Sequence, residues 1–360
     1  MKLMIEFYIT ICILLLIFNM MFVLNKNIEI MYFGNSSKHF QRYILKTYGK
    51  YNTMNRLDKK DKKKINRKLG KVKYLAALHE TMQMLKPIDT EFEEDIKRTV
   101  WNQVDKYLNK NNEEQGYFAY VLSTFNYSSI TECDDNMIHF ISFLKTDSLY
   151  TLTNAMSAIC RFNNPYMVHL AIEIINTSHI FYHKKLLTQE LLNFKGDQEE
   201  LKQILISNFK QYNNTIKEGI LDYFRLKELE ASDFCMEILE DEKEDNEIIY
   251  AAMRYMAKNP TEKAKMIFQN ILDKGSYDWI KEMLAINGLI RFKDSFTKEL
   301  IYGKVTDINW DVRSNAIKYF VINFPVESDL KAILKLKDKY TNESLIYQYK
   351  QISEEAKNMN

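Results

Sequence analysis

The chain has 360 residues, of which 46% are apolar and 27% are charged, a balance that excludes a disordered chain. It contains only 9 glycines and 4 prolines, too few for the tight turns of a sheet-rich fold, so the composition favours helices. The formal net charge of +2 hides one basic block, because residues 25–73 carry +12 and residues 74–360 carry −10.

The first predicted element is a membrane-spanning helix. Phe7–Leu24 is an uncharged run of 18 residues, which at about 1.5 Å per residue nearly spans a bilayer core of roughly 30 Å. A cleaved signal peptide is the alternative, but no small-residue cleavage step follows the run. The positive-inside rule places the basic C-terminal side in the cytoplasm. We therefore expect residues 1–25 to form a single-pass anchor in the cell membrane, with the N-terminus outside and the C-terminal domain cytoplasmic.

Residues 26–70 are predicted to form a basic juxtamembrane neck. Such cations can each contribute on the order of 1 kcal/mol beside an anionic leaflet. A solvated helix face is the alternative interpretation, and nucleic acid is not an expected partner because the rest of the chain is acidic. The candidate contacts to anionic lipid are Lys59, Lys60, Lys62, Lys63, Lys64, Arg67 and Lys68.

From residue 71 onward the sequence predicts one helix after another. Apolar residues recur at helical spacing in Lys71–Lys86 and Glu91–Asn109, within an N-terminal helical region over residues 71–130. Residues 131–357 then repeat a pattern of small residue, apolar stripe and turn. Pro165, Pro260 and Pro325 lie at such turns, separated by three and two periods of about 32 residues. A period in this range indicates helical hairpins that bury their apolar sides by stacking on one another.

The stretch from Asp307 to Ala316 resembles the signature of HEAT repeats. Asp311, Val312, Arg313 and Ala316 match the aspartate, valine, arginine and small residue that open the first helix of such a unit, whereas the Asn246–Ala252 unit has Tyr250 near the place of the arginine. The resemblance implies an all-α fold, an N-terminal transmembrane helix followed by a right-handed α-solenoid of HEAT-like helical hairpins. It also implies contacts between repeats for Asp311 and Arg313. The chain is similar to membrane-anchored HEAT proteins of Gram-positive bacteria, some of which accompany membrane glycosyltransferases.

Three residues are candidates for binding a protein partner: Trp279, Trp310 and Arg313. Tryptophan and arginine are favoured at binding hot spots, although packing between repeats is the alternative role. No catalytic, cofactor or metal site is predicted. His179 and His183 have a spacing that suits a metal on a helix, with Thr177 near the expected helix start, but no third ligand is evident. The four cysteines are expected to be reduced thiols buried in a cytosolic domain.

The sequence thus predicts a membrane-tethered cytosolic scaffold, not an enzyme, that binds a protein partner through a helical-repeat surface. The partner would be a membrane enzyme such as a glycosyltransferase, or its accessory, held at high local concentration by the tether. One alternative is a lyase-like enzyme built on helical repeats, which is a fold-level analogy. The other is a module that binds anionic lipid or nucleic acid through the basic neck. No cofactor and no small-molecule substrate are expected.

Overall fold

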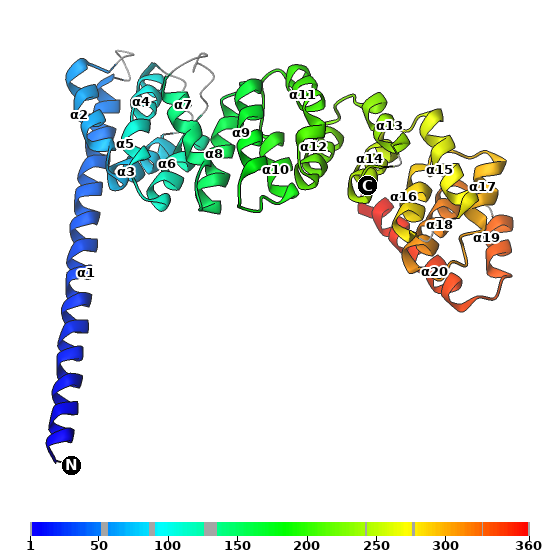
Figure 1. The fold of residues 1–360 in the computed structure, drawn as a ribbon, viewed down its shortest axis with the longest axis horizontal. Helices are drawn as coiled ribbons and strands as arrows, with labels where there is room; N and C mark the ends of the chain where they lie inside the picture. The colour runs from blue at the N-terminus through cyan, green and yellow to red at the C-terminus, as the bar shows by residue number, and fades with distance from the viewer. Residues whose placement is uncertain are drawn as a thin grey trace. The chain divides into compact units, whose positions relative to one another are not determined.

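The computed structural model describes residues 2–51, 57–85, 91–125, 135–241, 243–275, 278–325 and 327–358. Within these ranges the chain is helical and contains no strand, which confirms the predicted all-α class. The helices pack into two compact units (Figure 1). The first comprises Met1–Asn164 with Ser178–Ile180, and the second comprises Pro165–Thr177 with Phe181–Asn360. The divide between them lies after residue 164, whereas the sequence suggested one after residue 130.

The first unit begins with one helix of 50 residues, α1 (Lys2–Tyr51). Its C-terminal half packs against α3 (Val72–Met84) and buries Phe40 and Ile44 completely, whereas its N-terminal half extends beyond the other helices of this unit (Figure 1). The predicted boundary between anchor and neck therefore lies inside a continuous helix.

The predicted membrane topology is not supported by this structure. In the part of the chain that is described, no helix is long and apolar enough to cross a bilayer. This finding contradicts the single-pass anchor, the cell-membrane localisation and the orientation inferred from it. The apolar run Phe7–Leu24 does not end in a separate neck, because α1 continues through Lys26, Arg42 and Lys46 into the packed unit. Within that run, the side chains of residues 7–10, 12–14 and 22–24 lie outside those that the structure describes.

The remaining helices of the first unit alternate between long and short. The predicted helix Glu91–Asn109 is two helices, because the fully buried Gln103 side chain donates to Asn66 and to the Thr99 carbonyl and fixes a turn between them. Tyr107 stacks on Phe118 with ring centroids 4.3 Å apart. The helices are α2 (Lys59–Leu69), α3, α4 (Glu91–Trp101), α5 (Val104–Leu108), α6 (Asn112–Thr124), α7 (Asp135–Ile141), η1 (Ser142–Leu144) and α8 (Leu149–Arg161).

The second unit is built from helical pairs. Its helices are α9 (Pro165–Thr177), α10 (Lys184–Leu192), α11 (Gln198–Ser207), η2 (Phe209–Gln211), α12 (Asn214–Lys227), α13 (Ser232–Glu240), α14 (Asn246–Lys258), α15 (Glu262–Lys274), α16 (Trp279–Gly288), α17 (Ser295–Tyr302), α18 (Trp310–Asn323), α19 (Glu327–Leu334) and α20 (Lys339–Asn358). The even-numbered helices from α10 to α20 pack each on the next, and α15 packs beside α13 and α17 (Figure 1). Successive even-numbered helices begin 29 to 33 residues apart, which confirms the predicted period.

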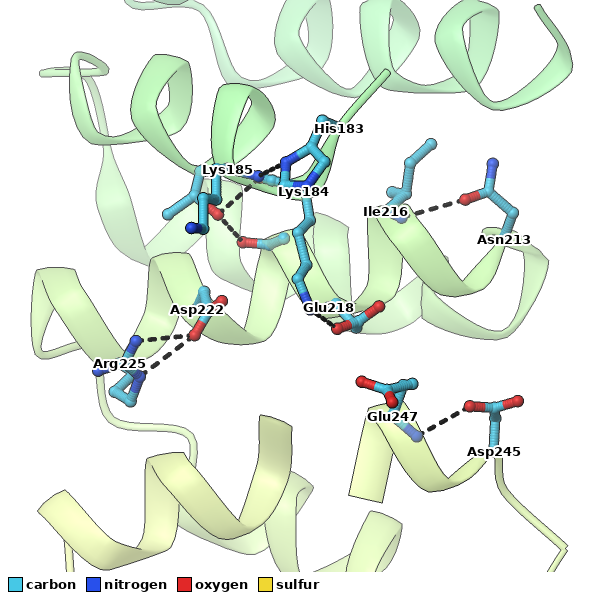
Figure 2. A network of polar contacts seen from close by, with 12 residues as sticks. His183, Lys184, Lys185, Asn213, Ile216, Glu218, Asp222, Arg225, Asp245 and Glu247 are labelled. Carbon is cyan, nitrogen blue, oxygen red and sulfur yellow. Dashed lines mark hydrogen bonds and ion pairs between the residues drawn. The ribbon is translucent and has the colours of Figure 1, made fainter. Parts of the chain in front are cut away.

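Polar side chains mark the start of each even-numbered helix. Asn213 and Asp245 accept hydrogen bonds from the first-turn amides of α12 and α14, and Lys184 of α10 reaches Glu218 of α12 (Figure 2). Similar contacts join later pairs: Lys217 to Glu244 at 3.1 Å, Tyr250 to Asp278 at 2.6 Å and Lys304 to Glu282 at 2.6 Å. The same end of the packed helices is therefore linked from one pair to the next.

A second recurring feature is a buried tyrosine that holds the preceding loop. Tyr223, Tyr255 and Tyr319 are fully buried and occupy positions one and two periods apart. The Tyr255 hydroxyl donates to the Leu229 carbonyl at 2.7 Å, and the Tyr319 hydroxyl donates to the Phe292 carbonyl at 2.8 Å. Burial raises the pKa of both phenols above the ordinary value for tyrosine, so they remain donors.

The Tyr255 hydroxyl is expected to contribute measurably to stability. It also accepts from the buried Ala231 amide at 2.8 Å, so Tyr255→Phe leaves a buried carbonyl and a buried amide without this partner. We expect the free energy of unfolding in urea to fall by about 1–3 kcal/mol. Tyr302→Phe, at a position 37% exposed, is the control and should change it little. Equal effects of the two substitutions would contradict this assignment.

Gly288 is expected to tolerate no side chain. A Cβ there would overlap the ring of Phe268, which is fully buried and cannot move aside. Gly288→Ala should therefore lower the free energy of unfolding by about 1–3 kcal/mol. At Gly116 a Cβ would also meet an aromatic ring, but Tyr150 is 49% exposed and can rotate into solvent. Thermal unfolding of both variants tests this difference, and a Gly116→Ala variant that loses more stability would refute it.

Candidate functional site

The most distinctive exposed surface of the second unit lies at the starts of α18 and α20. Asn309 caps α18 by accepting from the amides of Asp311 and Val312 at 2.8 and 3.3 Å. The fully buried Thr341 of α20 donates to the Val305 carbonyl at 2.9 Å. The loop before α18 is thereby fixed against the first turn of α20.

Arg313 lies at the centre of this arrangement. Its Nε donates to the Ser344 hydroxyl of α20 at 3.3 Å, and its guanidinium also donates to the carbonyls of Asp307 and Ile308. The residue is only 6% exposed. These contacts span two neighbouring helical pairs, so Arg313 has the role between repeats that the resemblance implied for it.

Aromatic side chains surround the guanidinium. Its carbon lies 5.5 Å from the ring centroid of Trp310 and 5.6 Å from that of Tyr340, within range of cation–π attraction. Trp310 in turn meets Tyr347 edge to face at 5.7 Å. The rings remain accessible, with Trp310 exposed by 42%, Tyr340 by 58% and Tyr347 by 46%, and Ile308 beside them by 97%. We refer to Ile308, Trp310, Tyr340 and Tyr347 as the α18–α20 aromatic surface.

The electrostatics of this surface combine one cation and one anion. Asp338 accepts from the Thr341 amide at 2.6 Å at the start of α20. Hydrogen bonds from the backbone and hydroxyl of Thr341, and the nearby positive charge of Arg313, lower the pKa of this carboxyl below its usual value. Both charges therefore persist at neutral pH, and stability from Asp338 is lost only as the pH falls through that lowered pKa.

The other residues singled out from the sequence occupy distinct places. Trp279 begins α16, one helical pair before Trp310, and is 42% exposed. Asp311 is exposed in the first turn of α18, where a negative charge suits the positive end of the helix dipole. Val312 and Ala316 are fully buried and serve packing.

The seven cations predicted to contact lipid lie on α2, and not all face solvent. Lys62 pairs with Asp95 at 2.9 Å, Lys64 lies 3.8 Å from the ring centroid of Tyr43, and Lys68 lies 4.8 Å from that of Tyr74. The others, Lys59, Lys60, Lys63 and Arg67, are exposed. Three of the seven thus help to attach α2 to its neighbours, and contact of the cations with anionic lipid stays a prediction.

Two residues of the surface, Tyr340 and Tyr347, were not identified from the sequence. Their spacing of seven residues places them on one side of a helix, and this was the available signal. Ile308 carried no such signal, because its exposure follows from the loop conformation that Arg313 stabilises.

The histidine pair considered for metal binding does not lie on a helix. Helix α9 ends at Thr177 and α10 begins at Lys184, so the expected helix start at Thr177 is wrong. His183 instead caps α10, with its Nδ1 accepting from the Lys185 amide at 3.1 Å (Figure 2). Across the described side chains, no group of three or more metal-ligating residues is found. Cys160 and Cys235 are buried free thiols, as expected, whereas Cys133 lies outside the described residues.

Comparisons with known proteins do not assign the chain to a family. No protein-family model, no curated protein and no solved structure matches it. The resemblance to HEAT repeats and the association with glycosyltransferases therefore stay predictions from the sequence.

Proposed function

We propose that this chain is a helical-repeat scaffold, an α-solenoid of HEAT-like hairpins, that binds a protein partner through the α18–α20 aromatic surface. The observation that carries the proposal is the grouping of three exposed aromatic rings around one anchored arginine. Tryptophan, tyrosine and arginine dominate the energetics of protein interfaces, and they do so in clusters of this kind.

The preorganisation of this surface favours binding. Arg313 is fixed by hydrogen bonds to the loop and to α20, so the rings that contact it lose little freedom when a partner docks. Tyrosine and tryptophan also combine apolar faces with a polar edge, which suits an interface that is exposed to water when the partner is absent. Two rings come from α20 and one from α18, so the surface depends on the stacking of adjacent pairs.

A photo-cross-linking experiment tests the proposal in the native host. A benzophenone amino acid replaces Ile308, which is 97% exposed and can be changed without disturbing the fold. Irradiation should attach one reproducible protein to the full-length chain, and Trp310→Ala should abolish the cross-link. The control places the same amino acid at Met266, which is 61% exposed on α15. The proposal fails if no protein is attached at Ile308, or if the same proteins are attached at both positions.

A further inference from the structure

A second apolar surface of this unit lies between α19 and α20. A groove of about 580 Å³ is lined on one side by Leu330 and Leu334 and on the other by Ile346 and Tyr349. The groove is accessible, because Leu334 is 46% exposed, Ile346 is 58% exposed and Tyr349 is 61% exposed. Apolar side chains gathered in this way on a surface mark a binding site.

This groove is distinct from the α18–α20 aromatic surface. An α-helix turns by about 100° per residue, so Ile346 and Tyr349 lie roughly 100° and 160° around α20 from Tyr347. The two surfaces therefore occupy different sides of the same helix, and a substitution in one leaves the other intact.

The surroundings of the groove are basic, although the body of the chain is acidic. Lys331 and Lys350 line it from its two sides. Residues 330–350 contain five lysines and two acidic residues, whereas residues 74–360 together carry −10. An occupant with negative charges at its edges is therefore favoured over a neutral or positive one.

The shape of the groove selects the kind of occupant. Its walls are two helical faces, with lining residues four apart on α19 and three apart on α20. The apolar stripe of an amphipathic helix has the same spacing and docks into open grooves of this type. We infer that this groove binds an amphipathic helix of a partner protein, with an apolar stripe in the groove and acidic side chains beside Lys331 and Lys350.

The probe for the test is a fluorescein-labelled synthetic peptide of about 18 residues, with leucines in one helical stripe and glutamates flanking it. Fluorescence anisotropy with the full-length chain measures its affinity. A peptide of the same composition in shuffled order and a peptide with lysines in place of the glutamates are the comparisons. We expect both comparison peptides to bind at least tenfold more weakly. Equal binding of the shuffled peptide would overturn the inference.

Variants of the chain separate the groove from other surfaces. The double substitution Leu334→Ser/Ile346→Ser should weaken binding of the acidic peptide at least tenfold, whereas Met266→Ser, at an exposed position on α15, should not change it. Lys331→Glu/Lys350→Glu should reverse the preference between the acidic and basic peptides. Unchanged thermal unfolding confirms that each variant is folded. Binding that survives both double substitutions contradicts the inference.

The same measurements identify other occupants. Laurate that displaces a groove-bound dye, without any binding of the acidic peptide, would assign the groove to a single-chain amphiphile and overturn the inference. A dimer that is lost in Leu334→Ser/Ile346→Ser would assign it to a second copy of the chain, with the same consequence. Trp310→Ala should leave peptide binding unchanged, so failure here is distinguishable from failure of the proposed function.

Discussion

Replacing Arg313 by alanine is expected to lower the free energy of unfolding by about 2–4 kcal/mol. The substitution removes a charged donor that is 6% exposed, and leaves the carbonyls of Asp307 and Ile308 and the hydroxyl of Ser344 without it. Hydrogen bonds to charged groups contribute about 1.5–3 kcal/mol each, and a buried acceptor left unpaired adds a further cost. Urea denaturation of the full-length chain measures the loss.

Two comparisons show whether the loss comes from these specific contacts. Arg313→Lys should recover only part of the stability, because an ammonium cannot reproduce the planar fork that serves Ser344 and the two carbonyls together. Arg67→Ala, at an exposed position on α2, should change stability by no more than about 0.5 kcal/mol. An Arg313→Ala variant as stable as Arg67→Ala would show that the arginine does not hold the two helical pairs together.

Replacing Trp310 by alanine is expected to weaken partner binding by at least about 2 kcal/mol, or roughly thirtyfold. The indole is the ring shared by the contacts to Arg313 and Tyr347, so its removal also releases Tyr347 from its edge-to-face contact. Biolayer interferometry with the protein captured at position 308 gives the affinity. The loss should appear mainly as faster dissociation.

Trp279→Ala is the matched control for this effect. Trp279 has the same exposure and the same place at the first turn of its helix, but it lies one helical pair earlier, on α16. We expect its replacement to change affinity by less than about threefold. If Trp279→Ala weakens binding as strongly as Trp310→Ala, the interface extends along the array and is not centred on α18 and α20.

The repeat was predictable because it is written in local patterns. Pro165, Pro260 and Pro325 recur with the period of the helical pairs, and Trp279 and Trp310 each begin a helix as expected. The match of Arg313 to a repeat signature also pointed to contacts between pairs. These features depend on residues close in sequence, which a pattern of about 31 residues makes visible.

Features that depend on distant residues could not be predicted. The break in Glu91–Asn109 requires Gln103 to meet Asn66, 37 positions earlier. The aromatic surface requires Tyr340 and Tyr347 to approach Trp310 across two helices, and only the arrangement of α18 and α20 determines that approach. Hydropathy indicated an anchor in Phe7–Leu24, but it could not indicate that the same helix would continue to Tyr51 and pack against α3.

The most direct measurement of the proposed interface is amide hydrogen exchange of the full-length chain with and without its cross-linked partner protein. If the α18–α20 aromatic surface binds that protein, the amides of residues 307–316 and 339–348 should gain protection on binding, while those of α10 and α12 exchange as before. Protection that appears elsewhere in the second unit, with no change at the starts of α18 and α20, would contradict the assignment of this surface.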